Sequence, residues 1–200
     1  METIHGKQRP YLVIDLEATC DDQSSIPREE TEIIEIGAVL VDALTLAPLG
    51  EWQSFVRPIR HPRLTPFCTQ LTSITQADVA TAPTFPVACT GLAQFVLGHD
   101  ALFCSWGEYD RNQFRRDGAR HGVRAPLGKD HLNLKAEFSR VTGIADKLGL
   151  GQALTRAGLR FQGTAHRGID DARNVARLLP YVLARVPLPA RRGWSAGRDG

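Results

Sequence analysis

The sequence has few cysteines and no long apolar run, and these absences exclude several classes of protein. Four cysteines, Cys20, Cys68, Cys89 and Cys104, are scattered without paired spacing among 200 residues. This excludes a zinc-ribbon pattern and predicts reduced, mostly buried thiols in a cytosolic protein. No stretch reaches membrane-spanning length, and no apolar signal-peptide region is present at the N-terminus. We therefore expect a cytoplasmic protein that makes no contact with a membrane.

Lysine is also scarce, since the chain has twenty Arg and four Lys against 22 acidic residues. The formal net charge of +2 excludes a polycation of the histone kind. Arginine is the better bidentate ligand for phosphate, although a GC-rich genome also favours it. The sequence contains no internal repeat and no low-complexity block, and its length fits one large domain or one domain with a tail.

The segment 11–20, YLVIDLEATC, predicts a central strand buried on both faces, because an apolar run follows Pro10. Asp15 and Glu17 lie two residues apart near its end, so their side chains point to the same side. Two like charges side by side repel each other unless a cation lies between them. Oxygen ligands suit Mg²⁺ or Mn²⁺, and phosphate commonly completes such a shell. The alternative is that the two acids simply end a strand in solvent.

The rest of the pattern predicts an α/β fold in which strands precede and alternate with helices. Further strands are expected at residues 31–42, 51–57, 100–105 and 131–134. Helices are expected at residues 86–97, 110–121, 135–142, 146–159 and 169–183. Short links between the first three strands favour an antiparallel meander, and residues 60–86 are expected to form a loop.

Both ends of the chain are polar and are expected to lie outside the folded domain. Residues 1–9 are predicted to form a flexible N-terminus, and the Arg/Gly/Ser-rich residues 188–200 a disordered tail. Residues 10–187 then form the single domain.

Three further acids are candidates for a site with Asp15 and Glu17. Glu32 and Glu35 lie toward the start of their strand, where a pairing or edge role is favoured over metal ligation. Asp110 comes where a strand ends and a helix begins. It is either a third metal ligand or an acid favoured by the positive end of the helix dipole.

Two stretches are candidates for contacts with nucleic acid. Arg116, Arg120 and Arg124 recur at every fourth position, a spacing that can follow a phosphate backbone. A solvated helix face is slightly favoured for this stripe. Leu71 and Thr72 are candidates for a lip over a substrate base, and a loop packed on the core is an equally good interpretation.

A set of short motifs gives the sequence a strong resemblance to a known family. DLEATC, EIIEIGAV, FCTQLTSIT, a Ser-Trp pair at Trp106 and HRGIDDARN follow one another in this order. Together they resemble the DEDDh 3′–5′ exonuclease superfamily, and within it the Eri-like group that includes histone-mRNA 3′ exonuclease. His166 lies five residues before Asp171, which favours the histidine branch, because the tyrosine branch would place Tyr where Arg167 stands. The resemblance spans roughly residues 10–186.

The resemblance implies a ribonuclease H-like fold with a five-stranded mixed sheet flanked by helices, and a site at the carboxyl ends of the central strands. The implied ligands for two divalent cations, Mg²⁺ or Mn²⁺, are Asp15, Glu17, Asp110 and Asp171. The resemblance also implies that Asp15 bridges both ions and that His166 is a general base for the attacking water. Asp170 is an alternative to Asp171 as a ligand, or else a helix N-cap. The family spacing selects Asp171.

The implied activity is a 3′–5′ exonuclease that releases nucleoside 5′-monophosphates from single-stranded 3′ ends, with RNA favoured over DNA. The expected substrate-contacting residues are Ala18, Leu71, Thr72, Trp106 and His166. The backbone around Ala18 would bond the terminal ribose hydroxyls, so that only a free 3′ end fits. The alternatives are a proofreading-type exodeoxyribonuclease and a non-catalytic nucleic-acid-binding regulator. All five catalytic positions are filled, which argues against the regulator. The sequence does not identify any protein partner.

Overall fold

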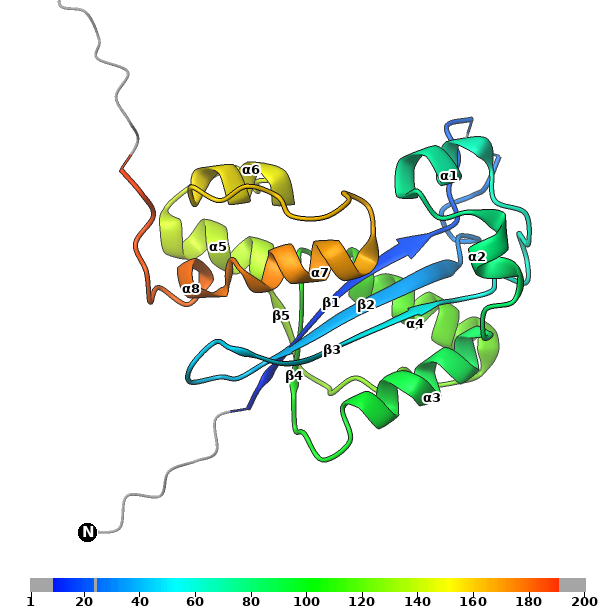
Figure 1. Ribbon diagram of the computed structural model, residues 1–200, viewed down its shortest axis with the longest axis horizontal. Coiled ribbons are helices and arrows are strands. Elements are labelled where there is room, and N and C mark those ends of the chain that lie inside the picture. Colours follow the sequence, from blue (N-terminus) through cyan, green and yellow to red (C-terminus); the bar gives the residue numbers. More distant parts are fainter. Residues whose placement is uncertain (1–8, 24, 191–200) are drawn as a thin grey trace, which may run out of the picture.

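The computed structural model describes residues 9–23 and 25–190, which form three layers (Figure 1). A five-stranded sheet is the middle layer. Helix α7 covers one face of the sheet, and α3 and α4 cover the other. The predicted α/β class and flanked mixed sheet are therefore confirmed.

The strands are β1 (Tyr11–Ala18), β2 (Ile33–Val41), β3 (Pro48–Phe55), β4 (Leu102–Ser105) and β5 (His131–Asn133). The helices are α1 (Pro66–Thr72), α2 (Gln76–Ala80), α3 (Phe85–Phe95), α4 (Tyr109–His121), α5 (Leu134–Thr142), α6 (Leu150–Arg156), α7 (Gly168–Ala176) and α8 (Leu179–Val182). The order in the sheet is β3-β2-β1-β4-β5. Antiparallel pairing joins β1, β2 and β3, and parallel pairing joins β1, β4 and β5. The predicted meander and the central position of β1 are confirmed.

Alternate residues of β1 enter two separate cores. Leu12, Ile14 and Leu16 pack with the aromatic side chains under α3 and α4. Val13 packs instead with the residues under α5 to α8. Burying each such side chain contributes about 1.5–3 kcal/mol, so both faces hold β1 in place. The acids at its end are thereby fixed relative to both helical layers.

Helix α7 lies unusually close to β2 at one point. A Cβ atom on Gly37 would lie 2.1 Å from the carbonyl carbon of Gly168. Only glycine at position 37 allows this approach, because no side chain fits such a gap. The close contact brings the first turn of α7 beside the carboxyl end of β1.

The segment 60–86, predicted as a loop, contains two short helices. Thr65 caps α1 by accepting a hydrogen bond from the backbone N–H of Cys68, and Pro66 stands in the first turn. Thr75 and Asp78 form a capping box at the start of α2. Helices of seven and five residues are too short to show a hydrophobic period, so only their capping residues signalled them.

The last predicted helix is interrupted. Helix α7 ends at Ala176, and α8 begins at Leu179 with Pro180 in its first turn. Proline has no N–H to continue the hydrogen bonds of a preceding helix, and its ring crowds the turn before it. The predicted continuous helix over 169–183 is therefore wrong at this point.

The residues at the predicted domain limits contact the domain. Arg9 forms ion pairs with Asp100 and Asp130, and Leu188 packs on the core beneath α5 to α8. The other residues of the predicted terminal segments, 1–8 and 191–200, lie outside the described residues. All four cysteines are free thiols, and three of them are buried. Within residues 9–23 and 25–190, no helix is both long enough and apolar enough to cross a bilayer.

Candidate active site

Carboxylates from three elements meet at the carboxyl end of β1. Asp15 and Glu17 come from β1 itself, Asp110 from the first turn of α4, and Asp171 from the first turn of α7. The negative charges of the other three each raise the pKa of Asp15, because they lie close to it. The four predicted ligands are therefore neighbours in space, although up to 156 positions separate them in the chain.

The environment of the four acids resists their ionisation. Burial, followed by the neighbouring carboxylates, raises the pKa of Asp15 well above its usual value. The same two causes raise the pKa of Glu17 to about 8. Burial raises the pKa of Asp171 to about 7 and that of Asp110 to about 6. Such a cluster favours bound cations, because a cation offsets both the repulsion and the lost hydration.

Asp110 is held against β1 by a backbone contact. Its Oδ1 atom accepts a hydrogen bond of 3.1 Å from the backbone N–H of Leu16, which lies between Asp15 and Glu17. This bond favours the ionised form and lowers the pKa of Asp110, which limits the rise caused by burial. The start of α4 is thereby joined directly to the acidic end of β1.

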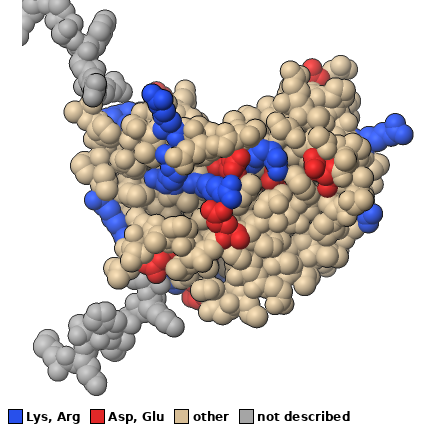
Figure 2. All heavy atoms as spheres, in the orientation of Figure 1, with Lys and Arg blue, Asp and Glu red and all other residues tan. Residues whose placement is uncertain are grey.

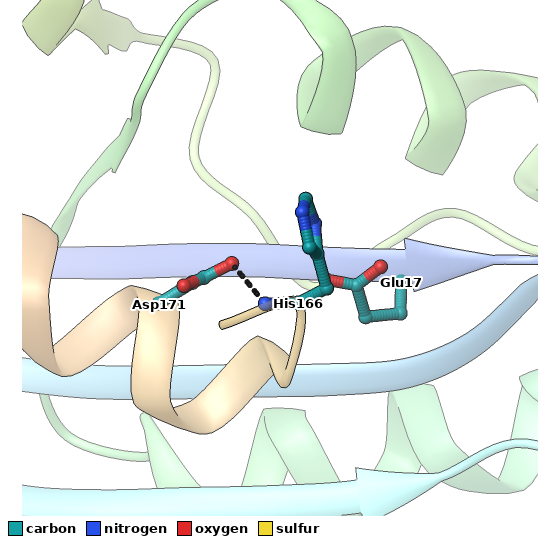
Figure 3. A group of neighbouring side chains, drawn as sticks. All are labelled: Glu17, His166 and Asp171. Atoms are coloured by element: carbon teal, nitrogen blue, oxygen red, sulfur yellow. Dashed lines mark hydrogen bonds between the residues drawn. The ribbon is translucent and has the colours of Figure 1, made fainter. Parts of the chain in front are cut away.

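His166 lies beside two of these acids. Ligand atoms of Glu17, His166 and Asp171 all lie within 4.8 Å of one another. Figure 3 shows His166 between the other two side chains, on the loop that leads into α7. The backbone N–H of His166 donates to Oδ2 of Asp171 at 3.2 Å, and the φ angle of His166 is 60°. Carboxylates and an imidazole are donors that divalent metals bind, so this group is a candidate metal site.

The neighbouring acid Asp170 has a different set of partners. Its carboxylate accepts hydrogen bonds of 2.9 Å from the backbone N–H of Thr164 and from Nη1 of Arg173. The N-cap position of α7 is occupied by Arg167, so Asp170 is not the cap. Asp170 therefore braces the loop from outside the candidate metal site, and Asp171 lies inside it.

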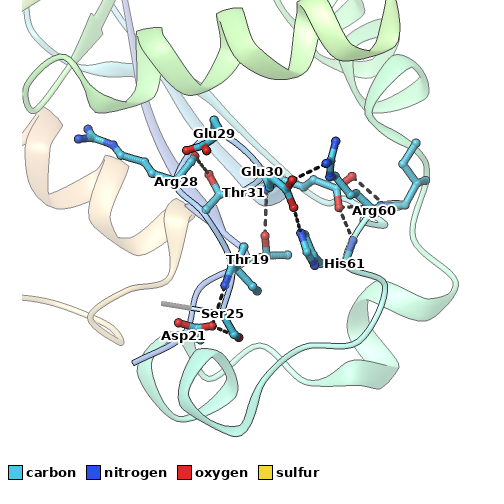
Figure 4. Close-up of polar contacts among 12 residues, drawn as sticks. Thr19, Asp21, Ser25, Arg28, Glu29, Glu30, Thr31, Arg60 and His61 are labelled. Atoms are coloured by element: carbon cyan, nitrogen blue, oxygen red, sulfur yellow. Dashed lines mark hydrogen bonds and ion pairs between the residues drawn. The ribbon is translucent and has the colours of Figure 1, made fainter. Parts of the chain in front are cut away.

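Glu32 and Glu35 both have structural partners. Glu32 accepts hydrogen bonds from the backbone N–H groups of three consecutive residues, Ile59, Arg60 and His61. Figure 4 shows the polar contacts around this point, including those of Arg60 and His61 with Glu30. The pairing role that the sequence favoured for both glutamates is confirmed.

The contacts of Glu35 with the His166 loop were missed by the sequence analysis. Glu35 is fully buried, and its Oε2 atom accepts hydrogen bonds of 3.0 Å from Nε of Arg167 and from the backbone N–H of Gly168. Gln53 on β3 donates to its other oxygen at 3.1 Å. The one available signal was a glutamate inside the apolar run EIIEIGAV, because a buried charge requires a partner.

The predicted substrate-contacting residues differ in their placement. Leu71 is partly exposed at 37%, whereas Thr72 is fully buried. The Thr72 hydroxyl donates to the carbonyl oxygen of Cys68 and accepts from the N–H of Ile74. The side chain of Thr72 is thus buried at the end of α1. This agrees with a segment packed on the core and not with a lip over a base.

The other two predicted substrate-contacting residues, Trp106 and Ala18, have different surroundings. The indole N–H of Trp106 donates to the carbonyl oxygen of Leu148 at 3.1 Å, and its ring packs edge-on against Phe138. The pairing of β1 with β2 is irregular between Glu17 and Ala18. A bulge of this kind interrupts the ladder and is common next to active sites.

Comparison with known proteins agrees with this geometry. Residues 12–179 match the exonuclease (RNase T) family. The chain is 31% identical over 185 residues to mouse ERI1 exoribonuclease 3, covering 88% of this chain and 54% of the relative. It therefore spans about half the length of that relative.

Two solved structures share the fold and a quarter of the sequence. The nuclease domain of 3′hExo, a DEDDh family member bound to rAMP, has a TM-score of 0.81 at 26% identity, covering 90% of this chain and 96% of that one. A 3′-exonuclease structure describing 3′-end specific recognition of the histone mRNA stem-loop also has a TM-score of 0.81, at 27% identity, covering 88% of this chain and 82% of that one. The chain belongs to the exonuclease family, and within it the chain is similar to the DEDDh members of the Eri group.

Proposed function

We propose that this protein is a 3′–5′ exonuclease that releases nucleoside 5′-monophosphates from single-stranded 3′ ends, with RNA favoured over DNA. The observation that carries the proposal is the meeting of four carboxylates, of which Glu17, Asp110 and Asp171 are buried, with His166 at the end of β1. The names of the relatives supply the preference for RNA, since they include exoribonucleases and a structure bound to rAMP. A cytoplasmic location is part of the same proposal.

The family uses divalent metals, and we propose that two ions, Mg²⁺ or Mn²⁺, bind here. Their ligands would be Asp15, Glu17, Asp110 and Asp171. When bound, the two cations supply positive charge at the attacked phosphate and at the leaving 3′-oxygen. The carboxylates fit this role because all four are acceptors of the hard oxygen type and their charges repel one another without a cation.

His166 is the proposed general base. Its side chain is exposed, so it can return a proton to solvent after each cycle. Its backbone bond to Asp171 places it at the edge of the carboxylate group. Proton removal from the attacking water by a side chain placed in this way contributes about 10²–10⁴-fold to the rate.

Selection of a free 3′ end is assigned to the edge of the site. The backbone at the irregular pairing of Ala18 is the proposed partner of the terminal ribose hydroxyls. Leu71, which is partly exposed, is the proposed apolar contact of the terminal base. Trp106 would shape the site by packing rather than by hydrogen bonding, since its N–H is already engaged.

Digestion of matched RNA and DNA oligonucleotides, each labelled at the 5′ end, tests the proposal. With Mg²⁺ or Mn²⁺ we expect a ladder of products shortened one nucleotide at a time, nucleoside 5′-monophosphate as the released product, and faster loss of RNA than of DNA. A His166→Ala variant should lower kcat by about 10²–10⁴-fold. Internal cuts, or products with a 3′-phosphate, would contradict the proposal. Faster digestion of DNA would instead favour the exodeoxyribonuclease alternative.

A further inference from the structure

Two adjoining hollows beside α4 are lined by cations and by no acidic residue. The larger, of about 760 Å³, lies between α4 and the segment that follows it. Its cations are Arg111, Arg115, Arg124 and Lys129. The smaller, of about 530 Å³, has Arg28, Arg115 and Arg116 as its cations. Arg115 lines both, so the two hollows form one surface, which we call the α4 basic groove.

This distribution of charge is unlike that of other surfaces of the molecule. Three other hollows each include at least one acidic residue. Figure 2 shows cations and carboxylates side by side on the face that carries α7, where Arg173 pairs with Glu51 and Asp170. Arg111 pairs with Glu108, but the remaining cations of the α4 basic groove have no such partner among the described residues. The groove therefore presents an excess of positive charge, which attracts an anionic ligand.

Four of the groove cations are not engaged by the protein. Arg28, Arg115, Arg124 and Lys129 are exposed, and their side chains form no ion pair within the described part of the chain. Figure 4 shows the side chain of Arg28 extending away from the neighbouring polar network. Arg120 of the predicted stripe differs, because it pairs with the buried Asp117 and donates to the carbonyl oxygen of Thr31. The spacing of arginines along the helix therefore identified only part of the groove.

The groove and the candidate active site share helix α4. Asp110 stands in the first turn of α4, and Arg111 and Asn112, which line the two hollows, follow it directly. The helix has thirteen residues, which span about 20 Å at about 1.5 Å per residue. A stacked nucleic-acid strand has one phosphate about every 3.4 Å, so about six nucleotides match this length.

The floor of the larger hollow is apolar and suits the faces of bases. Val123, Ala125 and Leu127 line it and are only partly buried. Proteins that hold single strands combine a positively charged groove with apolar or aromatic surfaces on which bases lie. A purely inorganic anion would make no use of this floor.

We propose that the α4 basic groove binds the single-stranded part of the substrate that lies 5′ to the cleaved end. The strand enters with its 3′ end at the carboxylates, and its upstream phosphates lie along Arg115, Arg124 and Lys129. This inference rests on the proposed nuclease function. It adds a substrate-length dependence, because very short substrates do not reach the groove.

A triple variant, Arg115→Ala, Arg124→Ala and Lys129→Ala, tests the groove in the full chain. Cleavage of a trinucleotide is compared with cleavage of an RNA of about twelve nucleotides, long enough to fill the groove. For the longer RNA we expect KM to rise about 10- to 100-fold at about 0.1 M salt, and the slope of log KM against log salt to fall by about two, as three phosphate contacts require. The effect on KM for the trinucleotide should be within about threefold.

The matched control removes three other exposed cations, through Arg57→Ala, Lys147→Ala and Arg160→Ala. These residues line neither hollow, and their replacement lowers the net charge by the same amount as the groove variant. The control variant should therefore follow the wild type in KM for the longer RNA and in its salt slope.

Binding of the same RNA, measured by fluorescence anisotropy in EDTA, keeps the groove testable apart from catalysis. Equal binding and equal salt slopes for the groove variant and its control would overturn the proposal. An equal rise in KM of the groove variant for the trinucleotide and for the longer RNA would also overturn it. If the wild type binds RNA through the groove but cleaves neither substrate, the nuclease proposal fails and the groove stands.

Discussion

Asp170 and Asp171 illustrate how neighbouring identical residues acquire different roles. Successive residues on a helix point about 100° apart, so the two carboxylates face different surroundings. Asp171 faces Glu17 and His166, and its pKa is raised to about 7 by burial. Asp170 faces Thr164 and Arg173 and braces the loop instead. The sequence alone left both residues open as ligands, because both stand in the first turn, and only the family spacing selected Asp171.

This difference gives a matched pair of variants. We expect Asp171→Asn to lower kcat/KM by more than about 100-fold, since losing even an outer partner of a metal ligand costs about 10–100-fold. Asp170→Asn keeps an oxygen acceptor for the backbone N–H of Thr164, so its kcat/KM should fall by less than about tenfold. Steady-state cleavage of 5′-labelled RNA measures both, and circular dichroism checks that both are folded. Near-normal Mn²⁺-dependent activity of Asp171→Asn would show that the ligand assignment is wrong.

At the scale of elements, the contact between β2 and α7 positions the loop that carries His166. Glu35 on β2 binds the side chain of Arg167 and the backbone N–H of Gly168 through one carboxylate. The Arg167 guanidinium also lies 5.1 Å from the centre of the Phe55 ring. Arg167 is thus a positioning residue. It holds the loop next to His166 through Glu35, and it makes no hydrogen bond to the four active-site carboxylates.

Replacement of Arg167 by Met should separate positioning from stability. Leaving Glu35 buried without its cation costs about 1–3 kcal/mol or more. A displaced His166 should lower kcat by about 10- to 100-fold while KM changes little. Arg167→Lys restores a cation and should recover part of the kcat. Urea unfolding and steady-state kinetics measure the two effects.

Arg173→Met on the same helix is the control for this prediction. Arg173 is 45% exposed and pairs with Glu51 and with Asp170. Exposed ion pairs of this type contribute about 0–1 kcal/mol, and Asp170 keeps its hydrogen bond from Thr164 when Arg173 is replaced. Its loss should leave kcat within about twofold of the wild type. Equal losses of kcat for Arg167→Met and Arg173→Met would mean that Arg167 has no special part in placing His166.

The elements show where sequence patterns are informative. The strand at 11–20 and the helix at 110–121 were predicted within two residues, because long apolar or amphipathic runs define them. Helices α1 and α2 were missed, because neither is long enough to show a period. The predicted helix at 146–159 is shortened to α6, since Gly149 and Gly151 weaken its start. The Glu35–Arg167 contact joins residues 132 positions apart, which no local pattern reports.

At the scale of the whole molecule, the packing of the fold opposes ionisation of the active-site carboxylates. Three of them have a pKa raised above the usual value of about 4, to about 6, 7 and 8 for Asp110, Asp171 and Glu17. The folded protein therefore binds more protons than the unfolded chain between about pH 4 and pH 8. By linkage, the free energy of unfolding of the metal-free protein falls as the pH rises through this window. The sequence indicated the acids, but only the packing of β1, α4 and α7 sets their pKa values.

Thermal unfolding at two pH values, with and without metal, tests this coupling. From about pH 5 to about pH 8 the free energy of unfolding of the metal-free protein in EDTA should fall by at least about 1 kcal/mol, which corresponds to a shift of less than one pKa unit. This fall lowers Tm by about 2–4 °C. His131 opposes this trend, because burial lowers its pKa and the neutral form is favoured at higher pH. The difference in Tm with and without Mn²⁺ removes the contribution of His131, since His131 lies outside the candidate metal site.

That difference should grow with pH, because the metal binds the ionised carboxylates and the protons compete with it. Asp15→Asn removes one charge from the cluster, so it should flatten the pH dependence in EDTA and reduce the gain from Mn²⁺. Asp100→Asn is the control. Asp100 is exposed, pairs with Arg9 and precedes β4 at the end of the sheet opposite to the carboxylates. The substitution changes the charge by the same amount and should follow the wild type. A metal-dependent gain in Tm that is equal at both pH values would mean that the raised pKa values do not arise from the site that binds the metal.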